Sequence, residues 1–247
     1  MVTATFRFYG NLNDFLAPAR RGRSFSCPCA RAASAKHMIE ALGVPHTEVA
    51  LVLIDGEPAS PRLDHMLRED ERVAVYPKFE HIDISPLLGV SAGDGSAPRF
   101  VADAHLVGLA RLLRMAGFDT LYDNHADDAR IAEVSVLEQR IVLTRDRDLL
   151  KRRVIARGCY VRALKADAQL REVAGRLDLC GHTRPFSLCL RCNVPLHPVD
   201  KAAVAARLPP AVAAAQEELN ACPNCGAIFW KGSHWKRMSA VLAGACG

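Results

Sequence analysis

The strongest constraint on this chain is a repeated Cys-x-x-Cys spacing, first at Cys189 and Cys192 and again at Cys222 and Cys225. Each spacing places two thiolates on one tight turn, and two such turns complete a tetrahedron of sulfur ligands around Zn²⁺. We therefore predict a four-cysteine site for one structural zinc ion. The alternatives are four unrelated buried cysteines, or a redox role for either pair, which no thioredoxin-like setting supports.

The chain contains nine cysteines, an odd number, and four of them belong to the two pairs. A reducing compartment would keep the cysteines as thiols, so we expect no disulfide framework. Cys180 and His182 form a Cys-x-His that could compete for the ion, but we expect both to be bystanders. The chain has no apolar run long enough for a membrane span and no signal-peptide layout at its amino terminus, so the expected location is the cytoplasm, without membrane contact.

The formal net charge of +5 is concentrated in the last two thirds of the chain. Residues 1–98 carry 10 basic and 12 acidic side chains, residues 99–182 carry 15 and 12, and residues 183–247 carry 7 and 3. This balance favours a polyanionic partner such as nucleic acid, although the solvated surfaces of many other proteins are equally basic.

Residues 1–83 have the pattern of a small β-grasp domain. Its predicted strands are residues 2–8, 24–29, 49–54 and 72–76. Ser34 can cap a helix that Gly43 ends, and Asp55-Gly56 is a typical tight turn. The order strand, strand, helix, strand, strand suits a β-grasp fold. Residues 84–98 are rich in glycine, serine and proline, and we predict a linker there.

Residues 99–179 alternate strands with helices, which predicts an α/β domain with a parallel sheet. The predicted strands are residues 100–102, 120–122, 140–144 and 160–164. An apolar stripe of Leu106, Leu109, Ala110 and Leu113 predicts a helix that Gly117 ends, and Asp127 or Asp128 opens a second helix.

Three aspartates, Asp103, Asp123 and Asp146, each lie where a predicted strand ends. The carboxyl ends of parallel strands meet at one edge of a sheet, and carboxylates gathered there repel one another unless cations neutralise them. Asp128 at a helix start and Asp148 just beyond Asp146 extend the cluster. We predict a Mg²⁺ or Mn²⁺ site, because both ions prefer oxygen ligands. The alternative is that each aspartate is an ordinary cap or loop residue.

Basic residues follow these acids closely. Those expected to contact nucleic acid here are Arg145, Arg147, Lys151 and Arg152. Carboxylates for a metal beside cations for phosphate are the composition that a metal-dependent phosphodiesterase requires. For the basic run alone, a solvated helix face is an equally good interpretation.

Aromatic and basic residues interleave again in residues 229–237, within a predicted zinc ribbon of residues 180–247. Lys231 and Lys236 are expected to hold phosphates, and Trp235 is expected to stack on a base. A ribbon this small also needs aromatic residues for its own core, which we favour for Trp230 and weigh equally for Trp235. Between the knuckles, residues 199–207 and 210–219 are predicted to form short helices.

The amino-terminal segment carries the motifs Phe6-Arg7-Phe8-Tyr9, Leu42-Gly43-Val44-Pro45 and Arg72-Val73-Ala74-Val75-Tyr76-Pro77. In these motifs it resembles the ubiquitin-like sulfur-carrier proteins of molybdopterin and thiamine synthesis. Those carriers end in a free Gly-Gly, whereas this chain continues through Phe79. We therefore do not expect sulfur carriage.

A further series of motifs begins at Arg99. They are Phe100-Val101-Ala102-Asp103, Arg111-Leu112-Leu113-Arg114, Tyr122-Asp123-Asn124, residues 143–150, Pro185-Phe186-Ser187, residues 189–193 and residues 230–235. This part resembles the PIN-like ribonuclease family named for the carboxy-terminal domain of the mutator-seven exonuclease (Mut7-C), whose bacterial members commonly carry a ubiquitin-like segment in front.

The resemblance to PIN nucleases implies catalytic acids at Asp103, Asp128 and Asp146, with Asp148 as an auxiliary acid. The glutamate that many PIN domains place on an intermediate helix has no clear equivalent in this chain, so either Asp123 replaces it or the metal site is reduced. The implied function is metal-dependent hydrolysis of RNA phosphodiesters, with structured RNA or tRNA among the substrates to consider.

The alternative function is a non-catalytic RNA-binding protein that keeps a degenerate PIN-like scaffold. In both cases the zinc ribbon would help to bind RNA, and the β-grasp domain would offer a surface for a protein partner. The sequence does not identify the RNA, the choice between endonuclease and exonuclease, or the oligomeric state.

Overall fold

The computed structural model describes residues 1–30, 32–60, 62–78 and 96–246. They form two compact units. The first unit comprises Met1–Ser96 and Thr144–Tyr160, and the second comprises Ala97–Leu143 and Val161–Gly247. Most of the linker predicted at residues 84–98 lies outside the described residues, and residues 96–98 have no regular secondary structure. None of the described helices combines the length and hydrophobicity that crossing a bilayer requires.

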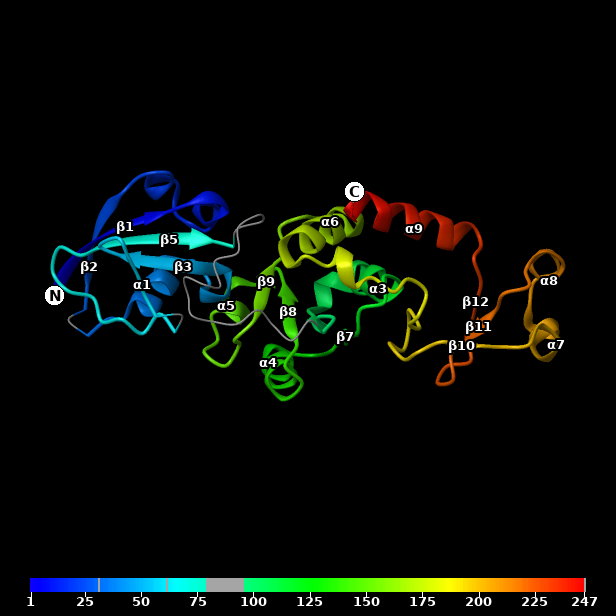
Figure 1. Ribbon diagram of the computed structural model, residues 1–247. Coiled ribbons are helices and arrows are strands. Elements are labelled where there is room, and N and C mark those ends of the chain that lie inside the picture. Colours follow the sequence, from blue (N-terminus) through cyan, green and yellow to red (C-terminus); the bar gives the residue numbers. More distant parts are fainter. Residues whose placement is uncertain (31, 61, 79–95, 247) are drawn as a thin grey trace. The chain divides into compact units, whose positions relative to one another are not determined.

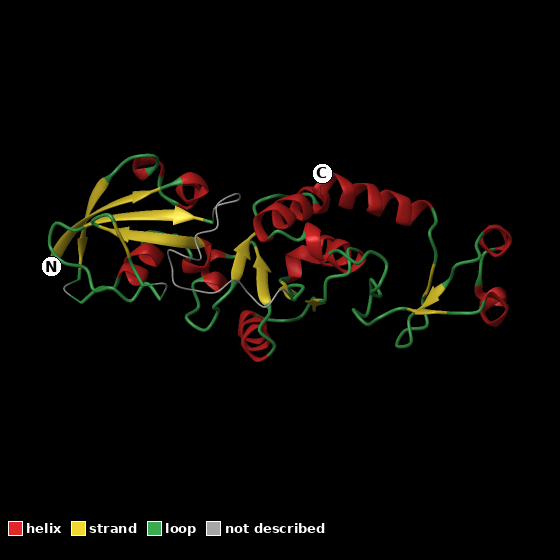
Figure 2. Cartoon of the chain, viewed as in Figure 1, coloured by secondary structure: helices red, strands yellow, loops and turns green. Residues whose placement is uncertain are grey.

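A mixed sheet forms the centre of the first unit (Figure 1). Its strands are β1 (Val2–Phe8), β2 (Phe25–Cys29), β3 (Val49–Ile54), β4 (Glu57–Pro58) and β5 (Arg72–Pro77). They lie in the order β2-β1-β5-β3-β4, with β1 and β5 parallel and the other neighbours antiparallel. Helix α1 (Ala35–Ala41) covers one face (Figure 2). This arrangement confirms the predicted β-grasp.

Local signals in the sequence account for the helix and the turns of this sheet. The Ser34 side chain accepts a hydrogen bond from the N–H of His37 and so caps α1. Gly43, with φ of 102°, ends the helix, and Asp55 and Gly56 both adopt positive φ in the turn between β3 and β4. The core between helix and sheet includes the fully buried Phe6, Ile39 and Val75. Short 3₁₀ helices η1 (Gly10–Phe15), η2 (Pro18–Arg20) and η3 (His46–Glu48) complete this part of the unit.

Residues 144–160 pack within the first unit, although they are distant from the β-grasp in sequence. They contain α5 (Arg147–Leu150) and β9 (Gly158–Tyr160). Tyr160 contacts the Phe15 ring edge to face at a centroid distance of 5.2 Å, and its N–H donates to Glu48 Oε1 at 2.8 Å. The strand predicted at residues 160–164 is present as β9 but lies earlier in the chain, at Gly158–Tyr160, and the residues after Tyr160 are not part of it.

A parallel sheet forms the centre of the second unit, as predicted. Strand β6 (Phe100–Ala102) pairs with β7 (Thr120–Tyr122) on one side and with β8 (Ile141–Thr144) on the other. Its helical elements are η4 (Ala104–Leu106), α3 (Val107–Met115), α4 (Asp128–Leu137) and α6 (Ala166–Leu177). Asp127 caps α4 by accepting from the N–H of Arg130. The crossover from β6 to β7 passes through α3, and the crossover from β7 to β8 passes through α4.

Gly117 ends α3 for two physical reasons. Its φ of 94° is accessible mainly to glycine, and a Cβ atom there would lie 2.3 Å from the carbonyl oxygen of Arg184. The N–H of Phe118 returns to the carbonyl of Leu113 at 2.9 Å, which closes the helix end. The predicted helix end at Gly117 is therefore confirmed. The missing side chain of this glycine also leaves room for the backbone at Arg184, which leads to the first knuckle.

The cysteine-rich part of the second unit has a small three-stranded sheet. Its strands are β10 (His197–Pro198), β11 (Asn220–Ala221) and β12 (Ile228–Phe229), and its helices are η5 (Cys180–His182), α7 (Lys201–Val204), η6 (Ala205–Arg207), α8 (Pro210–Ala215) and α9 (Ser233–Cys246). Trp230 packs against a core of Val204, Leu208 and Leu219, as favoured from the sequence. The sequence did not predict α6 or α9, which lie against each other (Figure 1).

A disulfide joins Cys180 in η5 to Cys246 at the end of α9. The expectation that the cysteines remain thiols was therefore wrong for these two. Cys180 and His182 are outside the four-cysteine group, as expected, and Cys180 is bonded to Cys246 instead. The two cysteines are 66 residues apart, so no local pattern could show the pairing. Helix α9, which ends at this disulfide, also packs against α6.

Candidate metal centre and nuclease site

The four cysteines of the two Cys-x-x-Cys pairs form one group, as predicted. Their sulfur atoms all lie within 4.8 Å of one another. The Sγ atoms of Cys189 and Cys225 are 3.7 Å apart, and a tetrahedron with metal–sulfur bonds of about 2.3 Å has edges of about 3.8 Å. Cys189 and Cys222 are buried, whereas Cys225 is exposed. The group can hold a metal ion such as zinc.

The two knuckles have the same backbone construction. The residue after the second cysteine has a left-handed conformation in both, with φ of 62° at Asn193 and 66° at Gly226. Its N–H donates to the carbonyl of the first cysteine at 2.9 Å in each knuckle. The N–H of each second cysteine also donates to the sulfur of the first, at 3.4 Å. Asparagine and glycine are the residues that reach this conformation most easily.

The thiols of this group have very different acidities in the absence of an ion. Burial raises the pKa of Cys189 to about 12, whereas a backbone hydrogen bond from Ala227, together with the neighbouring Cys192, lowers the pKa of Cys225 to about 7. Four thiolates this close together repel one another unless a cation neutralises them. A bound divalent cation would therefore supply the charge that keeps all four sulfurs ionised.

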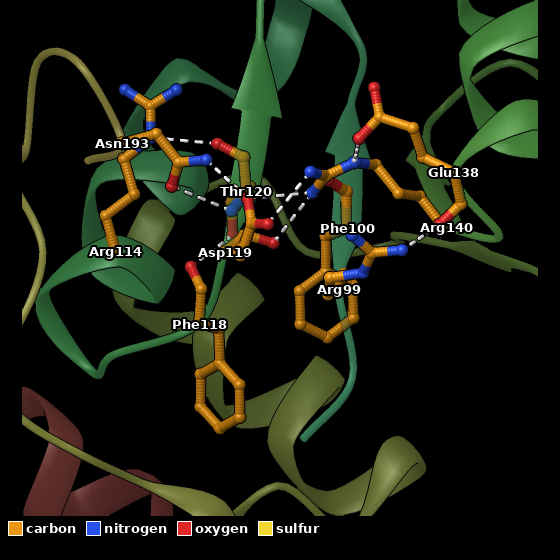
Figure 3. Close-up of polar contacts among 9 residues, drawn as sticks. All are labelled: Arg99, Phe100, Arg114, Phe118, Asp119, Thr120, Glu138, Arg140 and Asn193. Atoms are coloured by element: carbon orange, nitrogen blue, oxygen red, sulfur yellow. Dashed lines mark hydrogen bonds and ion pairs between the residues drawn. The ribbon is translucent and has the colours of Figure 1, made fainter. Parts of the chain in front are cut away.

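A polar network around Asp119 ties the first knuckle to the parallel sheet (Figure 3). Asn193 Oδ1 accepts from the N–H of Thr120 at 2.9 Å, and Asn193 Nδ2 donates to Asp119 Oδ1. Arg140 donates two hydrogen bonds of 2.8 Å to the two Asp119 oxygens. Its Nε donates to Glu138 Oε2, also at 2.8 Å. The knuckle residue Asn193 is therefore held by the same carboxylate that pairs with Arg140.

The charges of this network stabilise one another. Burial alone would raise the pKa of Asp119, but the hydrogen bonds from Arg140 and Asn193 hold that pKa below its ordinary value of 3.8. Burial alone would lower the pKa of Arg140, but its hydrogen bonds to Asp119 and Glu138 raise it instead. The carboxylate and the guanidinium therefore both remain charged near neutral pH.

Arg114 makes a second connection between α3 and the first knuckle. Its side chain is buried, with Nε donating to the carbonyl of Thr120 and one terminal nitrogen donating to the carbonyls of Leu190 and Arg191, all between 2.9 and 3.0 Å. Burial lowers the pKa of Arg114. Sequence reasoning noted Arg114 only as part of a motif and assigned no role to Asp119, Arg140 or Asn193. An arginine on the apolar face of α3 was the available signal.

Asp103, Asp123 and Asp128 of the second unit lie at the ends of elements, as predicted. Asp103 directly follows β6 and precedes η4, and Asp123 directly follows the neighbouring parallel strand β7. Asp123 accepts a hydrogen bond from the N–H of His125 at 2.9 Å. Asp128 is the first residue of α4.

Among the described residues, the four cysteines are the only group of three or more Cys, His, Asp or Glu side chains placed to hold one ion. Asp103, Asp123 and Asp128 therefore do not form a second such group. A small cavity of about 130 Å³ lies beside Asp123 and is lined mainly by apolar side chains of β6, β7 and α4.

Asp146 and Asp148 belong to the first unit and are exposed. Asp146 caps α5, because its Oδ1 accepts from the N–H of Asp148 at 2.7 Å, and its own N–H donates to Thr144 Oγ1 at 2.9 Å. The Asp148 carboxylate pairs with Lys151 at 3.0 Å. Asp146 thus has the cap role that the sequence left as an alternative.

Several of the basic residues predicted to contact nucleic acid have protein partners. The Arg147 guanidinium lies over the rings of Phe15, at 5.0 Å, and Tyr160, at 5.7 Å. Lys231 pairs with Glu218 at 2.7 Å on the surface. Arg145 is half-buried and Arg152 is exposed. The remaining two, Lys236 and Trp235, lie in the first turns of α9, with Lys236 exposed and Trp235 half-buried.

Models of known protein families match both parts of the chain. A model of the Mut7-C RNAse domain matches residues 98–242, which is more than half of the chain. The chain belongs to the Mut7-C RNAse family. A second family model, described as Mut7-C ubiquitin, matches residues 1–83.

Two individual proteins are also similar to this Mut7-C chain. The human protein described as exonuclease mut-7 homolog is 35% identical over 119 residues, which cover 43% of this chain and 14% of that protein. The chain thus spans about one seventh of the length of this relative. The crystal structure of H. volcanii small archaeal modifier protein 1 matches at 15% identity with a TM-score of 0.26, and the match covers 32% of this chain and 100% of that one.

Proposed function

We propose that the protein is a metal-dependent ribonuclease that hydrolyses RNA phosphodiesters. The observation that carries the proposal is the match of residues 98–242 to the Mut7-C RNAse domain. The similarity to a protein named as an exonuclease supports it. The proposed domains are a β-grasp at residues 1–83, a linker at 84–98, a PIN-like domain at 99–179 and a zinc ribbon at 180–247.

The proposed catalytic residues are aspartates at the ends of strands and starts of helices. Asp103, Asp128 and Asp146 would bind Mg²⁺ or Mn²⁺, with Asp148 as an auxiliary acid and Asp123 as an additional one. A bound ion would lower the pKa of a water molecule and neutralise charge on the phosphodiester. The parallel pairing of β6 with β7, which places Asp103 and Asp123 at the same sheet edge, is consistent with this assignment.

The cysteine group would hold one zinc ion with a structural role. Cys189, Cys192, Cys222 and Cys225 leave no open coordination position, which is typical of structural rather than catalytic zinc. Through Asn193 and Arg114, a stable knuckle would also hold the end of α3 and the start of β7. The β-grasp domain would contact a protein partner.

A non-catalytic RNA-binding protein is the second candidate function. The observation that favours it is that Asp103, Asp123 and Asp128 do not form a three-ligand group in the described part of the chain. Here the fold would serve as a scaffold and the basic and aromatic surface would bind RNA without cutting it.

Cleavage assays separate the two candidates. We would incubate wild-type protein, and a variant with Asp103→Asn and Asp146→Asn, with single-stranded RNA, structured RNA and tRNA in Mn²⁺ or Mg²⁺. The proposal expects cleavage by the wild type that requires the added metal and is at least about 10-fold slower in the variant, because two proposed metal ligands lose their charge. An Asp64→Asn variant changes an exposed aspartate in the first unit and is the control.

Equal cleavage by wild type and variant would reject the assigned aspartates. Absence of cleavage by the wild type on every substrate, together with retained RNA binding, would support the scaffold function instead.

A further inference from the structure

A cavity of about 290 Å³ lies in the second unit, outside the zinc group and the aspartates. It is bordered by residues 186–190, by β12 and by the first turns of α9, and its lining is mainly apolar. Three aromatic residues carry the argument: Phe186, Phe229 and Trp235. A cavity near the lower end of the usual range for ligand sites suits a single ring system rather than a large ligand.

The rings at this cavity are held in place rather than loosely exposed. Phe186 and Phe229 pack edge to face at a centroid distance of 6.4 Å. Trp230, which also lines the cavity, is fixed on its other side by the ribbon core of Val204, Leu208 and Leu219. The aromatic surface is therefore organised before any ligand arrives, which reduces the entropy lost on binding.

Phe186 has a backbone conformation that a bulky residue rarely adopts. Its φ is 67°, in the left-handed region. Two hydrogen bonds hold it there: the N–H of Phe186 donates to the carbonyl of Met115 at 2.9 Å, and the N–H of Arg184 donates to that of Ala116 at 2.8 Å. Strain of this kind is found preferentially at functional sites. Here it keeps an aromatic ring at the cavity where glycine would fit the backbone better.

The chain segments that line the cavity also carry exposed cations. Arg184, Arg191, Lys236 and Arg237 each lie within two residues of a lining residue. No ion pair joins any of these four side chains to a described carboxylate, in contrast to Lys231, which pairs with Glu218. The first turn of α9 also has no acidic residue and instead contains Lys236, although a helix start favours negative charge. The charge here complements an anionic ligand that also has an apolar part.

We propose that this cavity binds one unpaired nucleobase of a single-stranded RNA segment, while cations including Lys236 and Arg237 hold the flanking phosphates. A nucleotide joins a flat aromatic ring system to an anionic group, which matches an aromatic cavity whose lining segments carry exposed cations. The inference rests on the proposed RNA substrate but concerns binding, so its test does not depend on cleavage.

The two tryptophans of the chain both line this cavity, so intrinsic fluorescence reports on it directly. We would titrate the full-length zinc-loaded protein, without added Mg²⁺ or Mn²⁺, with an oligouridylate of about ten nucleotides. A strand of the same length with abasic riboses keeps the phosphates but removes the bases. The proposal expects quenching by the oligouridylate and binding to the abasic strand that is roughly 5- to 150-fold weaker.

Two variants test the aromatic contacts. Phe229→Leu and Phe186→Leu keep apolar volume but remove an aromatic face, and each should weaken oligouridylate binding by roughly 5- to 150-fold while leaving abasic-strand binding unchanged. Phe25→Leu makes the same change in the first unit and should have no effect. The zinc content of each variant is measured, and a variant that has lost its zinc is treated as misfolded. The affinity of the other phenylalanine variant for oligouridylate then tests the proposal.

The cations have their own test. Lys236→Gln with Arg237→Gln should weaken binding of both strands and reduce its salt dependence, whereas Arg62→Gln, an exposed arginine in the first unit, should change neither.

Equal affinity for the two strands, or unchanged binding by both zinc-loaded phenylalanine variants, would overturn the nucleobase site. Fluorescence that responds to an apolar peptide or to protein concentration, and not to RNA, would also overturn it in favour of a protein interface. RNA cleavage without a fluorescence change would overturn the nucleobase site but would still support the ribonuclease activity. Quenching without cleavage would support the pocket and count against the nuclease.

Discussion

At the scale of single residues, Asp119 links the parallel sheet to the first knuckle. It binds Arg140 through both oxygens and also accepts from Asn193 of the first knuckle. Arg140 is only 4% exposed at its side chain, so its charge depends on carboxylate partners. The loss of one carboxylate would therefore disturb the sheet and the knuckle together.

We expect Asp119→Asn to lower the free energy of unfolding by about 1–3 kcal/mol at pH 7, because the buried Arg140 loses its bidentate partner. The Asp119 side chain is 35% exposed, which limits the effect through solvent screening. The pKa of Asp119 is lowered in the folded protein, so its stabilisation is present above the ordinary pKa of 3.8 and is lost as the pH falls further. The difference between wild type and variant should therefore shrink below about pH 4.

Urea unfolding at pH 7 and at pH values below 4 measures this difference. Glu133→Gln is the control, because Glu133 forms an exposed ion pair with Arg130 on α4. A difference that stays constant over this pH range would contradict the assignment.

At the scale of elements, the two knuckles and α9 depend on links that are remote in sequence. Each knuckle is a local turn, but only the pair provides four sulfur ligands. Helix α9 continues from the strand after the second knuckle and is fastened at its far end by the disulfide to Cys180. The carboxy-terminal part of the chain is therefore held at one end by the cysteine group and at the other by the disulfide.

We expect the wild-type protein to contain one zinc ion per chain and Cys222→Ser to lose it, because a hydroxyl is a poor replacement for a thiolate ligand. Metal analysis after dialysis, together with circular dichroism, measures the loss. Cys159→Ser is the matched control, since Cys159 is equally buried but outside the group. Full zinc content in Cys222→Ser would show that the four cysteines are not the ligands.

We expect Cys180→Ser to lower the free energy of unfolding by up to about 4 kcal/mol under oxidising conditions, because a bridge across 66 residues restricts the unfolded chain strongly. With a reductant present, wild type and variant should unfold at the same urea concentration. Amide exchange should locate the weakened region in α9. Identical stability of the two proteins without reductant would mean that the bridge contributes nothing.

At the scale of the whole molecule, each unit is assembled from two separate stretches of the chain. Residues 144–160, which carry Asp146 and Asp148, pack with the β-grasp in the first unit. His46 contributes through its Nε2, which lies 2.9 Å from the carbonyl oxygen of Ile155, and Glu48 contributes through Tyr160. The ubiquitin-like domain is thus part of the packing around a segment that belongs to the nuclease match.

We expect Glu48→Ala to destabilise this packing by about 1–3 kcal/mol, because Glu48 is 2% exposed and its loss leaves the N–H of Tyr160 without this acceptor. Hydrogen exchange at residues 158–160 should become faster. Glu57→Ala, an exposed position in β4, is the control. Unchanged exchange at residues 158–160 would show that Glu48 does not hold the segment.

Signals that act over a few residues made much of the fold predictable. The alternating apolar residues predicted the strands of the β-grasp correctly. Ser34 marked the start of α1, and Gly43 and Gly117 marked helix ends, because caps and turns of this kind depend only on residues close in the sequence. The paired Cys-x-x-Cys spacing indicated the metal group for the same reason, because each knuckle is a complete local turn. The catalytic role of the aspartates stays a prediction, since residues at strand ends and helix starts can be caps as well as metal ligands.

By itself, then, the sequence determined the kinds of element present, the β-grasp and parallel-sheet classes, and the four sulfur ligands. Only the tertiary structure decided which distant residues meet: Asp119 with Asn193 and Arg140, Cys180 with Cys246, residues 144–160 with the β-grasp, and the rings around the aromatic cavity. The physical reason is that caps, turns and knuckles form within a few residues, whereas these contacts depend on how whole elements pack.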